Sequence, residues 1–225
     1  MQQFSVIRAS VFRALRPWLF DKVMPLELAT AVKQRYEFIK APSDGTQLNQ
    51  PVDFQAGKFK WSDKVIGVEQ FVVAYVGNKA TSLGVSTRES TDASEAFLED
   101  LIAWASRQYN LDPKEVLPRS YFSQVEFVLS RPLHERFAEL RPISDGITEF
   151  VRGYGLEQCP LYEMTGLSLN YDFVKYEDLK PGPQPFAVER RLGATFDENK
   201  YFSQAPLRTQ DHRTILERLE TILSH

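Results

Sequence analysis

The chain has 225 residues and a formal net charge of −3, with 43% hydrophobic and 25% charged residues. This composition is typical of a folded globular protein and excludes a disordered chain. The acidic balance offers no general attraction for phosphate backbones, so we expect no nucleic-acid partner. Cys159 is the only cysteine, and no apolar run approaches the roughly 18 residues of a membrane-spanning helix. We therefore expect a soluble cytoplasmic protein without an intrachain disulfide and without a transmembrane segment.

The first element is predicted as a short amphipathic helix that ends near Pro17, because apolar residues recur at helical spacing. Part of the same run also shows the alternating pattern of a strand, so a strand remains an alternative interpretation. A second helix is predicted from Pro25 to Val32 and a strand over 36–40. The apolar residues that carry the first pattern are Phe4, Ile7, Val11, Leu15 and Trp18.

Residues 52–86 read as an antiparallel meander, since three runs rich in Val, Ile and aromatic residues are separated by turn signals such as Gly77-Asn78. A helix is predicted over 92–109, with Asp92 as its N-cap and Glu95 completing a capping box. Residues 110–119 contain two prolines and form the best candidate for a boundary within the chain.

The second half repeats the pattern of strands followed by a helix. The predicted elements are a strand over 121–129, helices over 133–152 interrupted around Pro142 and Gly146, a strand region over 161–173, a proline-rich loop over 180–185, strands over 186–192 and 200–202, and a terminal helix. We expect a single α+β domain over 1–225, built on an antiparallel aromatic-rich sheet with helices on one face. Two related strand-helix halves are an open alternative.

A short internal similarity bears on that alternative. The sequence Tyr-Phe-Ser-Gln occurs at 121–124 and again at 201–204, each time followed by a Pro-Leu pair, a histidine and a helical run. An ancient duplication would explain it, although a chance match is favoured for four letters in a chain of this length.

Catalytic motifs are absent from the sequence. It contains no phosphate-binding loop and no nucleophile elbow, and Gly153-Tyr-Gly155 lacks the third glycine of a dinucleotide fingerprint. The three histidines show no metal-ligand spacing, so we expect no metal and no cofactor. His134 with Glu135, or His212 with Asp211, could supply an acid-base pair, but solvated histidines are favoured. Cys159 is predicted to be a buried filler rather than a nucleophile.

The turn over 86–92 is the sharpest local cluster. Free backbone N–H groups at a helix start, together with hydroxyls and an arginine, can bind a phosphate or carboxylate. Asp92 and Glu95 place negative charge in the same turn, so helix capping is favoured. The candidate anion-binding residues are Thr87, Arg88, Ser90 and Thr91.

The N-terminal segment is the candidate partner-binding surface. Residues 1–40 hold seven Lys/Arg against three Asp/Glu, and this asymmetry can mark an interaction site. A helix packed on its own domain is favoured over this role, and an interfacial membrane helix is the third alternative. The candidate contact residues are Arg8, Phe12, Arg13, Arg16 and Trp18.

Two classes of function follow from these observations. The first is a non-catalytic interaction or assembly component of the cytoplasm that binds a protein partner or a second copy of itself. The alternative is an enzyme or binding protein for a small phosphorylated or carboxylated ligand at the 86–92 turn, where a histidine acts as acid or base.

Overall fold

The computed structural model describes residues 3–15, 26–42, 51–76, 79–109, 116–154, 162–172, 174–175 and 183–224. The chain divides into two compact units. We call residues 6–124 and 206–212 the N-terminal unit, and residues 1–5, 125–205 and 213–225 the C-terminal unit. Whether the chain folds as a single domain stays a prediction. Of the expected connector over 110–119, residues 110–115 lie outside the described residues and 116–119 begin a strand.

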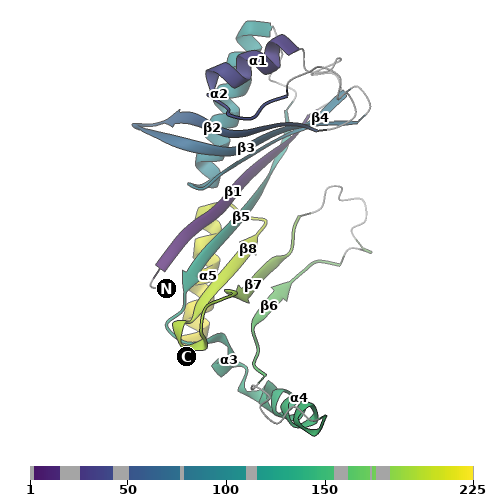
Figure 1. Ribbon diagram of the computed structural model, residues 1–225, viewed down its shortest axis with the longest axis vertical. Helices are drawn as coiled ribbons and strands as arrows, with labels where there is room; N and C mark the ends of the chain where they lie inside the picture. Colours follow the sequence, from purple (N-terminus) through teal and green to yellow (C-terminus); the bar gives the residue numbers. More distant parts are fainter. Residues whose placement is uncertain are drawn as a thin grey trace. The chain divides into compact units, whose positions relative to one another are not determined.

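Helices and strands are mixed along the chain (Figure 1). The elements up to the middle of the chain are β1 Gln3–Leu15, α1 Leu26–Arg35, β2 Val52–Trp61, β3 Lys64–Val76, β4 Lys79–Thr87, α2 Thr91–Tyr109 and β5 Val116–Val128. The remaining elements are α3 Leu133–Arg136, the 3-10 turn η2 Ala138–Leu140, α4 Arg141–Gly153, β6 Gly166–Leu169, β7 Phe186–Arg190, the 3-10 turn η3 Phe196–Glu198, β8 Lys200–Ala205 and α5 Thr209–Ser224.

The strands hydrogen-bond in the order β2-β3-β4-β1-β5-β8-β7-β6. The pairs β1–β4, β2–β3, β3–β4, β6–β7 and β7–β8 are antiparallel. The α+β fold with an antiparallel sheet is therefore confirmed. The meander predicted over 52–86 corresponds to β2, β3 and β4.

The order of elements repeats. The first half contains a strand, a helix, three strands and a helix, in the order β1-α1-β2-β3-β4-α2. The second half repeats this order as β5-α4-β6-β7-β8-α5, with α3 and α4 in the place of the first helix. This supports two related halves. The two Tyr-Phe-Ser-Gln runs lie on β5 and β8, which occupy different places within one half. That short similarity therefore does not coincide with the structural repeat.

Aromatic rings fill the core of the N-terminal unit. Phe97 on α2 is fully buried, and its ring centroid lies 4.6 Å from that of Tyr36, 5.6 Å from Phe59 and 5.8 Å from Phe71. Buried residues of α1 belong to the same cluster as side chains from four strands. Since successive side chains of a strand point to opposite faces, α1 and α2 cover one face of this unit's strands (Figure 1).

The C-terminal unit has its own buried residues. The rings of Phe127 and Tyr201 lie 5.9 Å apart, and the hydroxyl of Tyr201 accepts a hydrogen bond of 2.9 Å from the backbone N–H of Leu133. Val188 on β7 and Leu216 on α5 are fully buried. In the part of the chain that the structure describes, no helix is both long and apolar enough to cross a membrane.

The helix predicted for the N-terminal segment is wrong, because residues 3–15 form strand β1. Ala9, Val11 and Arg13 alternate as buried residues facing the helices, and β1 pairs with β4 from Ala9 to Ala14. A backbone in the middle of a sheet gains hydrogen bonds on both sides, which outweigh the helical spacing of five apolar residues.

Two further predictions need correction. Residues 36–40 form a turn with one isolated bridge from Lys40 to Gln55 rather than a strand. Glu37 has φ of +51°, which interrupts an extended backbone. Helix α4 continues through Gly146, since an isolated glycine weakens a helix by only about 1 kcal/mol. Pro142 lies in the first turn of α4, where its missing N–H costs nothing.

Candidate functional site

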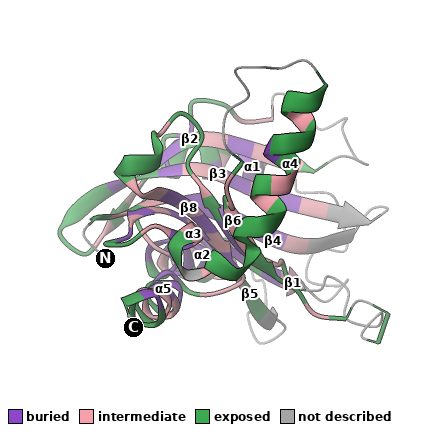
Figure 2. Cartoon of the chain, turned by 90° about the horizontal axis from the view of Figure 1, so that it is seen from below, coloured by how far each residue is buried: buried purple, intermediate pink, exposed green. Residues whose placement is uncertain are grey.

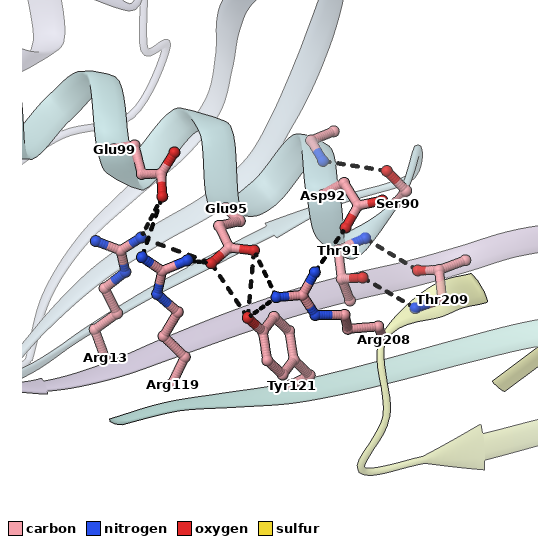
Figure 3. A network of polar contacts seen from close by, with 11 residues as sticks. Arg13, Ser90, Thr91, Asp92, Glu95, Glu99, Arg119, Tyr121, Arg208 and Thr209 are labelled. Atoms are coloured by element: carbon pink, nitrogen blue, oxygen red, sulfur yellow. Dashed lines mark hydrogen bonds and ion pairs between the residues drawn. The ribbon is translucent and has the colours of Figure 1, made fainter. Parts of the chain in front are cut away.

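The start of α2 is closed by side-chain caps (Figure 3). Ser90 is the N-cap instead of the predicted Asp92, because its Oγ accepts a hydrogen bond of 3.1 Å from the N–H of Ala93. The N–H of Thr91 donates to Oγ1 of Thr209 at 3.0 Å, and the N–H of Thr209 donates to Oγ1 of Thr91 at 2.9 Å. The first turns of α2 and α5 thus satisfy each other's backbone donors.

The four candidate anion-binding residues do not converge. Thr87 is fully buried and its hydroxyl lies 3.0 Å from Oγ of Ser94. Arg88 is 77% exposed and forms an ion pair with Glu69 on β3. The N–H of Thr91 already has a partner in Thr209, and Ser90 is occupied as the cap. An anion site at this turn stays a prediction, with capping the role that these contacts support.

A buried ionic cluster lies one helical turn further along α2 (Figure 3). Glu95, only 7% exposed, is surrounded by three arginines. Its Oε1 pairs with Arg119 on β5 and lies 3.8 Å from Nη2 of Arg13, and its Oε2 lies 3.4 Å from Nη2 of Arg208. The hydroxyl of Tyr121 donates to the same carboxylate at 3.2 Å.

The cluster is balanced in charge. Glu99 lies 3.2 Å from Nη2 of both Arg13 and Arg119, and Asp92 lies 3.7 Å from Nη1 of Arg208. Burial, followed by the nearby Arg119 charge, lowers the pKa of the Arg13 guanidinium. Because both oxygens of Glu95 are engaged, this carboxylate is not free for proton transfer. We interpret it as a polar connection between β1, α2, β5 and the start of α5.

The buried histidine His212 belongs to α5. Its Nδ1 lies 2.7 Å from Oγ of Ser123 on β5, and its ring is fully buried. Burial lowers the pKa of His212 to about 4, so the ring is neutral near pH 7. The neighbouring Asp211 is exposed and does not form the acid-base pair considered from the sequence.

We expect His212 to make stability depend on pH. Its pKa is about 6.5 in the unfolded chain and about 4 in the folded protein. A lowered folded pKa gives stability that is complete above pH 6.5 and is lost as the pH falls toward 4. The free energy of unfolding should drop by about 2 kcal/mol between pH 7 and pH 5, measured by urea unfolding. In His212→Gln this drop should largely disappear, and parallel pH profiles for both proteins would contradict the assignment.

The other described histidine has a partner distant in sequence. Nδ1 of His134 lies 3.1 Å from Oε2 of Glu163, so the structure brings His134 to Glu163 rather than to Glu135. The two line a cavity of about 310 Å³ together with Arg141 and Tyr162. Cys159 lies outside the described residues. Among the described residues, no group of His, Cys, Asp or Glu is arranged to hold a metal ion.

Strand β1 presents a second face, opposite the side that α2 covers. We use the name "open face" for one set of side chains on β3, β4, β1 and β5 of the N-terminal unit. These side chains point away from α1 and α2. Its members include Arg8, Ser10, Phe12, Gln70, Val72, Ser82, Gly84, Ser86 and Phe122. Arg8 is the only charged residue of this set, and Asp53 on the adjoining β2 pairs in register with Val72 and accepts a hydrogen bond of 3.1 Å from Nε2 of Gln70.

Phe12 is the most exposed aromatic residue of the open face, at 44%. It pairs in register with Gly84 on β4, and a Cβ at Gly84 would lie 2.9 Å from two atoms of the Phe12 ring. Glycine is therefore needed where the Phe12 ring lies against the neighbouring strand. Beside it, Nη2 of Arg8 donates to Oε1 of Gln70 at 3.0 Å.

The candidate partner-binding residues separate on β1. Arg8 and Phe12 belong to the open face, whereas Arg13 is 5% exposed on the opposite face within the ionic cluster. Arg16 and Trp18 lie outside the described residues. The alternation of side chains along a strand would have separated these residues once the strand was chosen over the helix.

No protein-family pattern matches the chain, and no curated protein sequence matches it significantly. One solved structure that aligns with it is TBP of Methanococcus jannaschii, at 9% identity and a TM-score of 0.47, over 99% of this chain and 98% of that one.

Proposed function

We propose that this chain is a non-catalytic binding protein that docks a partner protein on the open face of its N-terminal unit. The observation that carries the proposal is Phe12, a ring that is 44% exposed and lies against Gly84 on a face with few charges. The core that α1 and α2 form with the strands lies on the opposite face.

The composition of the open face supports a protein partner. The cores of protein interfaces are depleted in Lys, Glu, Asp and Ser and enriched in aromatic residues and arginine. The open face fits this pattern in Phe12, Phe122 and Arg8, whereas its serines Ser10 and Ser86 are only 1% and 2% exposed and offer a partner little surface. An aromatic ring fixed in place loses little entropy on binding.

The ionic cluster supports the same function indirectly. Arg13, on the other side of β1, is fixed by Glu95 and Glu99, and the hydroxyl of Ser94 on α2 donates to the carbonyl of Ala9 at 2.8 Å. Because α2 anchors β1 from behind, Phe12 is presented on a rigid strand. Rigid presentation is what a preformed docking surface requires.

We expect Phe12→Ala to lower recovery of the partner at least about fivefold when the tagged full chain is isolated from its source cells, since a central aromatic anchor contributes about 2 kcal/mol or more. Gly84→Ala should weaken binding as well, because its Cβ displaces the ring without removing it. Ile39→Ala is the control, since Ile39 is 76% exposed outside the open face.

Quantitative mass spectrometry of the recovered proteins gives the result, with thermal unfolding to confirm that each variant folds. A partner recovered equally well with all three variants would place the binding surface elsewhere. The proposal fails if no protein depends on either Phe12 or Gly84 for its recovery.

A further inference from the structure

Helix α4 is amphipathic, and its apolar side faces solvent. Ile143 is 62% exposed, Ile147 41%, Phe150 68% and the adjoining Tyr154 80%. Their spacing of three or four residues places them on one stripe, and Figure 2 shows most of α4 exposed. A stripe of this kind on a folded protein marks a contact surface.

The polar side of α4 is the side that packs on its own chain. Thr148 is 3% exposed, and its Oγ1 accepts a hydrogen bond of 3.3 Å from the N–H of Tyr162. Gly146 and Gly153 have nothing within 4 Å of an added Cβ. No described part of the chain therefore packs against these two positions, which leaves room for close approach of another backbone.

The repeat of elements shows where an apolar stripe of this kind belongs. In the first half, the helix between the first and second strands is α1, and its Leu28, Ala29 and Val32 are buried in a core with residues of β2 and β3. Helix α4 occupies the same place in the order of the second half. Strands β6 and β7 are the counterparts of β2 and β3.

The counterpart strands carry an open cleft instead of a packed helix. The cleft, of about 590 Å³, lies between β6 and the segment that connects β7 to β8. Leu167, Leu192 and Phe196 line it together with the charged Glu189, Arg190 and Arg191, and Leu192 is 94% exposed. The C-terminal unit therefore exposes an apolar helix stripe and, on the counterpart strands, a cleft that presents Leu167, Leu192 and Phe196.

We propose that two copies of this chain pair reciprocally, with the apolar stripe of α4 from each copy seated in the β6–β7 cleft of the other. Reciprocal seating covers both surfaces in both copies and closes the assembly as a two-fold dimer. It also keeps the contact between Thr148 and Tyr162, which α4 would break if it turned its stripe into the cleft of its own chain.

Charge argues against a lipid occupant. Interfacial membrane helices are rich in Lys and Arg on their polar side. The charged residues of α4 are two of each sign, namely Arg141, Asp145, Glu149 and Arg152. This dimer lies beyond the proposed function, which concerns the open face of the N-terminal unit.

Sedimentation velocity of the full chain should show a dimer whose share rises with concentration. Phe150→Asp on α4 and Leu192→Asp at the cleft each put a charge into the apolar contact, and each should raise the dimer dissociation constant at least about tenfold. Ile39→Asp, at a residue that is 76% exposed in the N-terminal unit, should leave it unchanged. A chain that stays monomeric at every concentration, or a dimer that both α4 and cleft variants leave intact, overturns the proposal.

Cross-linking separates the possible occupants. With Cys159 replaced by serine, Ile147→Cys and Leu192→Cys are made in separate chains, mixed, and treated with a short bis-maleimide. We expect a cross-linked pair from the mixture. A chain that carries both cysteines serves as the control. If only this double variant is cross-linked, and the cross-link forms within one chain, then α4 closes on its own cleft and the proposed dimer is wrong. The proposed dimer is also wrong if the monomer binds phosphatidylcholine vesicles and Phe150→Asp abolishes that binding, because lipid would then cover the stripe.

Discussion

Replacing Phe97 with alanine is expected to lower the free energy of unfolding by about 3 to 5 kcal/mol, the range for removing a buried ring. Phe97 is fully buried, and four other aromatic rings lie around it: Tyr36, Phe38, Phe59 and Phe71. These rings come from the segment after α1 and from two strands, so the cavity cannot close by moving one side chain. Urea unfolding followed by circular dichroism measures the loss.

Phe150→Ala is the matched control for this substitution. Phe150 is 68% exposed on α4, so removal of its ring at low protein concentration should change stability by less than about 0.5 kcal/mol. Equal losses for both variants would show that Phe97 does not occupy the core described here.

Glu95→Ala is the second substitution with a large expected effect, a loss of about 3 to 5 kcal/mol. The carboxylate neutralises three arginines, and Arg13 is itself only 5% exposed. Removal of Glu95 leaves Arg13 with Glu99 as its remaining acidic partner and leaves the Tyr121 hydroxyl without its acceptor. A buried charge that loses a partner is far more costly than a surface pair that is broken.

Glu99→Ala tests whether burial is the cause. Glu99 contacts the same two arginines, Arg13 and Arg119, but its side chain is 54% exposed. We expect this variant to lose less than about 1 kcal/mol. Chemical unfolding of both variants at low and high salt gives the comparison, and similar losses for Glu95 and Glu99 would contradict the importance of burial.

Periodicity and turn residues determined much of the fold. The predicted helix over 92–109 matches α2 within one residue, and the meander over 52–86 matches β2, β3 and β4. In these segments one pattern is strong and its competitor is weak, so local sequence decides. Turn signals such as Gly77-Asn78 added independent evidence.

Local sequence failed where two patterns compete. Residues 3–15 satisfy helical spacing and strand alternation at once, and pairing with β4 decides in favour of the strand. The N-cap was misassigned to Asp92 for a related reason. Ser90 and Asp92 are both good caps, and the neighbouring Thr209 and Arg208 determine which one is used.

The candidate sites depended on contacts across long stretches of sequence. Arg13 and Glu99 are 86 residues apart in the chain but form a hydrogen bond, so Arg13 is part of the buried cluster instead of a free basic surface. His134 has Glu163 as its partner rather than the adjacent Glu135. Sequence periodicity does not predict such pairings, because they depend on the order of the strands in the sheet.

By itself, the sequence determined the fold class, the main helix of the N-terminal unit and the aromatic character of its core, because these follow from local spacing and composition. Only the tertiary structure decided which face of each element is covered. The amphipathic character of α4 is already present in its sequence, yet its exposed stripe became visible only when Thr148 was seen to face inward. Burial depends on which residues are neighbours in space, and local sequence does not contain that information.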